Sequence, residues 1–174
     1  MLSLAEINDL DEDAFVRTLG PLFEHSSWVA GTAWHRRPFG SVSALHGALV
    51  ESVAQAPRER QLALIDSHPE LGGHAARRGE LTAESTREQA SAGLAQLPSD
   101  EADALVRLNR SYRERFGFPL IVCAREHTPD SILAYGAARL EHSREEEIDI
   151  ALGEIAKIAE LRLRDAVFED PAAG

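Results

Sequence analysis

The chain has 174 residues, of which 44% are hydrophobic and 27% charged, and its formal net charge at pH 7 is −11. This composition is ordinary for a globular protein, and the length fits one domain, residues 1–174, with a sizeable core. The negative charge argues against nucleic acid or an anionic membrane as a partner, and no apolar run approaches the roughly 20 residues of a membrane span.

The cysteine content indicates a compartment. Cys123 is the only cysteine, so no internal disulfide can form, and we expect a reducing cytoplasm. The first residues lack the basic and apolar regions of a signal peptide, which agrees with this expectation.

Helix start and stop signals recur along the chain, and strand-like alternation is nearly absent. Capping residues and prolines predict nine helices. The first is a short helix after Ser3, and another begins after Ser26 and ends before Pro38. The others cover residues 12–19, 41–56, 57–67, 83–97, 99–116, 128–142 and 143–168. The sequence therefore predicts an all-α fold, a compact helical bundle of about seven to ten helices.

Residues 117–124 depart from this pattern. They are short, apolar and bounded by glycine and proline. Periodicity cannot separate a buried extended segment from a short helix here, so both remain open. Cys123 within this segment is most simply a small core residue.

Residues 67–73, SHPELGG, interrupt the predicted helices. Pro69 stops the helix, and the two glycines let the backbone bend. His68 therefore lies at a helix-to-loop break, where its ring can face a cleft, and histidine titrates near working pH. The alternative is a histidine favoured by the helix dipole, with glycines that only end the helix.

Glu88 is a second candidate. Ser85 and Glu88 have capping-box spacing, in which Glu88 would only satisfy a backbone N–H. If Thr82 is the cap instead, Glu88 lies in the helix body among small residues that leave space for a ligand. The sequence leaves both open.

Arg162 is the third candidate, because it falls on an apolar stripe. Steps of four and three join Ile148, Leu152, Ile155, Ala159, Arg162 and Ala166. A buried arginine needs an anion. That anion is either a protein carboxylate, Asp165 or a more distant one, or a ligand carboxylate. By contrast, the three glutamates at 145–147 are typical of a solvated helix start, where the helix dipole favours negative charge. We also expect the side chain of Arg113 to be solvated.

These motifs together resemble the 2-oxo-4-hydroxy-4-carboxy-5-ureidoimidazoline (OHCU) decarboxylase family over essentially the whole chain. Residues 67–73 are similar to its HPDLAG-like signature, with Glu70 for Asp and Gly72 for Ala as conservative departures. Four further stretches follow the family's other motifs: residues 23–28 with 37–41, residues 81–94, residues 112–123 and residues 154–163.

The resemblance implies an all-helical, usually dimeric enzyme of urate breakdown, which needs no cofactor or metal and converts OHCU to (S)-allantoin and CO2. By position, His68 would be the catalytic acid, with Glu88 and Arg162 contacting the substrate. The pocket would be lined by Pro69, by Ser85, Thr86, Arg87, Glu88 and Gln89, and by Leu120, Ile121, Val122, Cys123 and Ala124.

Two other functions compete with this interpretation. A non-enzymatic helical binding module would show no turnover and an exposed apolar groove. A metal-dependent hydrolase would use His68 and His74 with Glu70, although their spacing matches no fixed metal motif.

Overall fold

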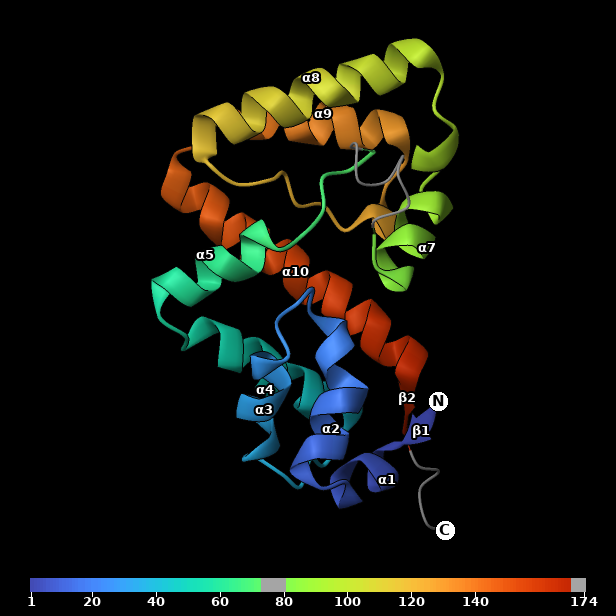
Figure 1. Cartoon of the computed structure of the whole chain (residues 1–174), viewed down its shortest axis with the longest axis vertical. Helices are drawn as coiled ribbons and strands as arrows, with labels where there is room; N and C mark the ends of the chain where they lie inside the picture. Colours follow the sequence, from blue (N-terminus) through green and yellow to red (C-terminus); the bar gives the residue numbers. More distant parts are fainter. Residues whose placement is uncertain (73–80, 170–174) are drawn as a thin grey trace. The chain divides into compact units, whose positions relative to one another are not determined.

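A computed structural model of the chain describes residues 1–72 and 81–169 (Figure 1). Within these residues the backbone forms nine α-helices, three short 3-10 helices and two strands of two residues each. The prediction of an all-α fold with seven to ten helices is confirmed. Gly73 and His74 lie outside the described residues.

The backbone divides into two compact units. The first comprises Met1–Leu64 and the chain from Ala156 onward, and the second comprises Ile65–Ile155. The prediction that residues 1–174 form one domain stays a prediction.

The first unit is built from short helices whose caps follow the sequence. The side chains of Ser3, Asp11 and Ser41 each accept a hydrogen bond from the backbone three residues on, as N-caps do. Its elements are β1 (Leu2–Ser3), α1 (Leu4–Asp9), α2 (Glu12–Leu19), η1 (Gly20–Leu22), α3 (Trp28–Trp34), α4 (Val42–Ala54), most of α5 (Arg58–Asp66), the C-terminal part of α10 (Arg144–Ala166) and β2 (Val167–Phe168). Helix α3 packs against both α2 and α4, around buried Phe15, Val29 and Leu45.

The end of α10 differs from the prediction. The helix stops at Ala166, because Val167 and Phe168 pair as a parallel strand with Leu2 and Ser3. A pair of two-residue strands shows no alternation that a sequence pattern could reveal. The start of α3 also differs, since Ser27 rather than Ser26 occupies the N-cap position, without a side-chain cap.

The second unit contains α7 (Ala83–Ser91), η2 (Leu94–Gln96), α8 (Ser99–Phe116), η3 (Ala124–Glu126), α9 (Pro129–Arg139) and the N-terminal part of α10. Helices α8 and α9 lie side by side (Figure 1). Gly136 permits this close approach, since a Cβ there would lie 2.7 Å from Cδ2 of both Leu108 and Leu120.

Two predicted helices in this unit are too long. Helix α7 ends at Ser91 instead of residue 97, because Gly93 adopts a left-handed φ of 78° that a helix cannot contain. Helix α9 ends at Arg139 instead of residue 142. The segment that the sequence left open, residues 117–124, is neither helix nor strand as far as Cys123, and its last residue, Ala124, begins η3.

Candidate active site

His68 lies where the sequence predicts, just beyond a helix end. Helix α5 stops at Asp66, and the backbone N–H of His68 donates to the carbonyl oxygen of Ile65 at 3.2 Å. Only 6% of the residue is exposed. The helix-to-loop break is therefore confirmed, and it places a buried imidazole beside Pro69, which is half-buried.

Two buried amide side chains hold the loop that follows His68. Oε1 of Gln89 accepts from the Gly72 N–H at 2.9 Å, and Nε2 of Gln89 donates to the Glu70 carbonyl at 3.3 Å. From α8, Nδ2 of Asn109 donates to the Leu71 carbonyl at 2.8 Å. Side chains thus satisfy three consecutive residues of a loop that has no secondary structure to do so.

Gly72 and Arg113 restrict the same loop further. Gly72 has a φ of 58°, and a Cβ there would lie 2.8 Å from Cδ2 of Leu105, so both the conformation and the space call for glycine. Arg113 donates from Nε to Glu70 at 3.0 Å and from Nη1 to Asp66 at 3.1 Å. Partial burial opposes its charge, but these two carboxylates outweigh that effect and raise the pKa of Arg113. Arg113 was predicted to be solvated; its side chain is indeed half exposed, but it also forms two ion pairs.

The cap of α7 is Thr82, whose side chain accepts from the Ser85 N–H at 3.2 Å. This settles the alternative that the sequence left open: Glu88 lies in the body of the helix, half-buried, with Ser85, Gln89 and Ala92 buried around it. Thr86 and Arg87 are exposed, and Arg87 pairs with Glu84 at 3.2 Å.

The structure brings two of the predicted substrate-lining segments together, because α7 packs against η3. All five residues of the second segment, Leu120 to Ala124, are buried. Cys123 is a buried free cysteine, as predicted, and its N–H donates to Oε2 of Glu154 at 2.7 Å.

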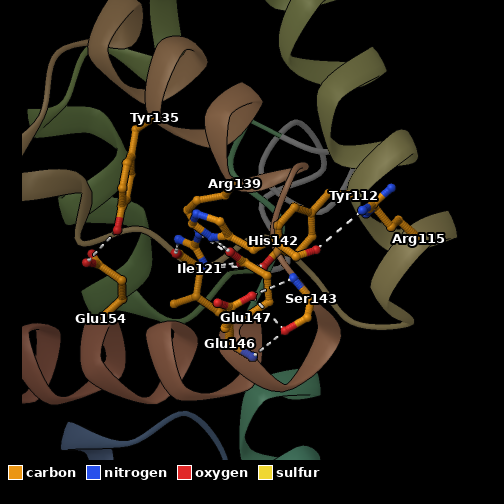
Figure 2. A network of polar contacts seen from close by, with 10 residues as sticks. All are labelled: Tyr112, Arg115, Ile121, Tyr135, Arg139, His142, Ser143, Glu146, Glu147 and Glu154. Carbon is orange, nitrogen blue, oxygen red and sulfur yellow. Dashed lines mark hydrogen bonds and ion pairs between the residues drawn. The ribbon is translucent and has the colours of Figure 1, made fainter.

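Behind this segment lies a buried polar network (Figure 2). Arg139 and Glu147 form an ion pair with neither side chain exposed, and the phenol of Tyr112 hydrogen-bonds to both. Burial and the hydrogen bond to Glu147 raise the pKa of Tyr112 well above its usual value of 10.0. Burial opposes the charge of Arg139, but Glu147 and Tyr112 outweigh it and raise the pKa of that guanidinium.

The sequence pattern missed this network. Residues 145–147 were predicted to form a solvated helix start, but Glu147 is completely buried. The signal was present, because Ile132, Gly136 and Arg139 follow steps of four and three on α9, as do Glu147, Ala151 and Glu154 on α10. Arg139, Glu147 and Glu154 therefore occupy inward-facing positions by the same periodicity as Arg162.

Arg162, in the first unit, is buried as its position on the apolar stripe predicts. Its Nη2 pairs with Oε1 of Glu24 at 3.0 Å, and Nη1 lies 3.4 Å from the carbonyl oxygens of both Pro21 and Leu22. Glu24, a distant carboxylate, is therefore an anion that the protein itself supplies to this arginine. Nothing in the local sequence pattern identified Glu24.

A pocket of about 480 Å3 lies beside α7. Gly72, Thr86 and Gln89 contribute to its wall, but the remaining lining is leucine and alanine, and neither His68 nor Glu88 is among the described lining residues. An anionic, polar ligand needs more polar partners than this. We therefore do not assign the reaction to this pocket.

Within residues 1–72 and 81–169, no three His, Cys, Asp or Glu side chains come together in a way that could hold a metal ion. The proposed ligand His74 lies outside those residues. No helix in the described part of the chain is long and apolar enough to cross a membrane.

Comparisons with known proteins agree with this architecture. The model of the OHCU decarboxylase family matches residues 8–164. A 2-oxo-4-hydroxy-4-carboxy-5-ureidoimidazoline decarboxylase of Haloferax volcanii is 44% identical over 164 residues, which cover 94% of this chain and 95% of that protein.

Solved structures show the same fold. A crystal structure of (S)-allantoin synthase aligns with a TM-score of 0.77 and 25% identity over 95% of this chain, which spans about half (54%) of that structure. A crystal structure of OHCU decarboxylase in the presence of (S)-allantoin aligns with a TM-score of 0.70 and 22% identity, covering 90% of this chain and 97% of that one.

The fold and these relatives define an all-helical carboxy-lyase. The chain belongs to the OHCU decarboxylase family.

Proposed function

We propose that this protein removes CO2 from OHCU to give (S)-allantoin, as a step in urate breakdown. The observation that carries the proposal is the buried His68, followed by a loop that Gln89 and Asn109 hold from α7 and α8. A proton donor for a stereospecific reaction must be held in one position relative to the substrate. The loop after His68, fixed by these two amide side chains, can hold the imidazole in this way. Family membership supplies the substrate class.

The chemistry suits these residue types. When the C–C bond to the carboxylate breaks, CO2 leaves and the adjacent imine accepts the electron pair. This internal electron sink is the reason why neither pyridoxal phosphate nor a metal is required. The enol-like intermediate then takes up a proton on one face of a single carbon, which gives the (S) product.

Each candidate residue has a role in this scheme. His68 handles the hydroxyl proton or delivers the stereochemical one, and Glu88 orients it. Arg162 orients the anionic substrate, with Glu24 limiting how tightly it binds the carboxylate. Tight binding of substrate and transition state alike would not raise kcat. The substrate-lining residues are Pro69, Ser85 to Gln89, and Leu120 to Ala124.

The wider setting belongs to the same proposal. We infer a homodimer, as is usual for the family that the sequence resembles, and a single domain over residues 1–174. We also infer a cytoplasmic location. The single cysteine, Cys123, supports this inference because it is buried and free, so the fold does not depend on a disulfide that an oxidising compartment would have to form.

Circular dichroism of allantoin formed from urate tests the proposal. Urate oxidase and hydroxyisourate hydrolase generate OHCU in place, with and without this protein. We expect rapid formation of (S)-allantoin that a chelator does not affect. His68→Asn should reduce the rate by about 100-fold or more, because general acid–base catalysis contributes about 10²–10⁴-fold.

The other outcomes are equally informative. Slow, racemic product equal to the protein-free control would refute the decarboxylase and favour a binding module. Activity that the chelator abolishes would favour the metal-dependent hydrolase with His68 and His74. An unchanged rate and product handedness in His68→Asn would remove the acid–base role from this residue.

A further inference from the structure

The segment Leu120 to Ala124 poses a structural problem. It is buried throughout, yet its first four residues belong to no helix or strand. Buried backbone N–H and carbonyl groups need hydrogen-bond partners, and a segment without regular structure cannot supply them itself. The partners of this backbone therefore come from elsewhere in the unit.

Arg139 supplies one of them. Its Nη1 donates to the carbonyl oxygen of Ile121 at 2.6 Å (Figure 2). The rest of the guanidinium is fixed as well, since Nε donates to Glu147 at 2.8 Å and Nη2 to the Tyr112 hydroxyl at 3.1 Å. A completely buried arginine with all three nitrogens engaged has a single available orientation.

Glu154 supplies the second. It is 3% exposed, and its Oε2 accepts from the Cys123 N–H at 2.7 Å. Its other oxygen lies 3.5 Å from the hydroxyl of Tyr135 (Figure 2). Arg139 from α9 and Glu154 from α10 thus hold two backbone atoms, the carbonyl oxygen of residue 121 and the amide nitrogen of residue 123. The two peptide groups that flank Val122 lie between these fixed points and can therefore shift little.

Stability alone does not account for these buried charges. Replacing a buried ion pair by apolar side chains of similar volume is often neutral or stabilising. Hydrogen bonds from charged groups are, however, shorter and more directional than neutral ones. What these hydrogen bonds add here is a fixed backbone geometry, which depends on having the acceptor oxygen and the donor nitrogen in place.

We propose that Arg139 and Glu154 are positioning residues for the decarboxylation. They fix the Leu120 to Ala124 backbone, whose peptide groups then present donors and acceptors to the ureido group of the substrate. A ureido group carries both N–H donors and a carbonyl acceptor, so peptide groups are its natural complement. This inference rests on the proposed function, because it assigns a role within that reaction.

Two variants of Glu154 form a matched test. Glu154→Gln and Glu154→Leu both remove the charge and preserve the approximate size, but only glutamine keeps an oxygen that can accept from the Cys123 N–H. We expect kcat/KM to fall by about 100-fold in Glu154→Leu, the effect of a misplacement of about 1 Å. Glu154→Gln should stay within about threefold of wild type, since one acceptor oxygen preserves the geometry.

Arg139→Lys provides a second route if Glu154→Leu does not fold. A lysine keeps the charge near Glu147, but a single ammonium cannot reproduce the three-way guanidinium contact. We expect the same loss in kcat/KM, with a raised KM. Ile132→Ala, which removes a buried side chain from α9, is the control for lost stability and should leave kcat/KM within about twofold when assayed folded.

The outcomes separate this inference from the function on which it rests. An active wild type with equal kcat/KM in Glu154→Gln and Glu154→Leu, whether both normal or both impaired, overturns the positioning role alone. A loss in Ile132→Ala as large as in Arg139→Lys also overturns it, since the effect is then one of stability. A wild type that forms no (S)-allantoin overturns both proposals.

Discussion

Neutralising Glu24 is the sharpest test of what Arg162 does. The pair is almost completely buried, with side-chain exposures of 4% for Arg162 and 2% for Glu24, and the two charged atoms lie 3.0 Å apart. Glu24→Gln preserves the shape and an oxygen that can accept from Nη2, but it removes the negative charge. The substitution therefore changes electrostatics with little change in packing.

The first expected effect is on stability. Removing one partner of a buried ion pair typically costs about 3–5 kcal/mol, and the retained hydrogen bond places this case near 3 kcal/mol. For a chain of this length, each kcal/mol shifts Tm by about 2–4 °C, so Tm should fall by roughly 9 °C. Thermal unfolding followed by circular dichroism measures this shift.

The second expected effect is on substrate binding. A substrate carboxylate on the far side of the guanidinium would lie about 7 Å from Glu24, where removing one charge is worth about 2 kcal/mol at an effective dielectric constant near 20. That corresponds to roughly 30-fold tighter binding of the anionic substrate. Because the carboxylate loses its charge as CO2 leaves, tighter ground-state binding should lower kcat as well as KM.

Steady-state kinetics on folded protein, well below the Tm of the variant, distinguishes the two roles of Arg162. KM that is unchanged or raised in Glu24→Gln would refute the contact between Arg162 and the substrate, and would leave the arginine a structural ion pair. The control is Glu51→Gln, which neutralises the exposed carboxylate that pairs with half-buried Arg36 in the same unit. It should change stability by less than about 1 kcal/mol and leave KM unaltered.

Two further predictions follow from the site. Gly72→Ala should destabilise the protein by about 1–2 kcal/mol because of its left-handed conformation, more if Leu105 is displaced, and should lower kcat by disturbing the loop after His68. The control is Gly153→Ala, on α10 with open space around it, which should leave both stability and kcat unchanged or slightly improved. Equal effects of the two variants in urea titrations and steady-state kinetics would contradict this prediction. Burial raises the pKa of Tyr112 above 10.0, so the contribution of its neutral phenol to the free energy of unfolding is complete below pH 10 and falls by about 1.4 kcal/mol per pH unit as the pH rises toward the folded-state pKa. Tyr112→Phe should lack this alkaline decline in the free energy of unfolding. A parallel decline in both proteins would contradict the assignment.

Local signals in the sequence were sufficient for much of the fold. Capping side chains such as Ser3, Asp11 and Thr82 act on backbone groups three residues away, so their effect can be read directly from the chain. The break after α5 was equally local, because Pro69 cannot continue a helix. The burial of Arg162 followed from the periodicity of α10, since residues four and three apart share a face.

Contacts between distant residues required the tertiary structure. Glu24, which pairs with Arg162, is 138 residues from it, and Glu154, which accepts from the Cys123 N–H, is 31 residues away. The two-residue strands exist only because the chain's first residues reach Val167 and Phe168. Sequence patterns report which face of a helix is buried, but not which element covers it.

Local sequence signals establish that this chain is helical, where most of its helices begin, and that His68, Glu88 and Arg162 are its candidate reactive residues. Their support comes from residues far away in the sequence: Gln89 and Asn109 hold the loop after His68, Glu24 balances Arg162, and Arg139 and Glu154 fix the segment from Leu120 to Ala124. The difference lies in the range of the interactions. Caps and periodicity act within one or two helical turns, whereas buried charges and irregular backbone find their partners only when distant helices pack together.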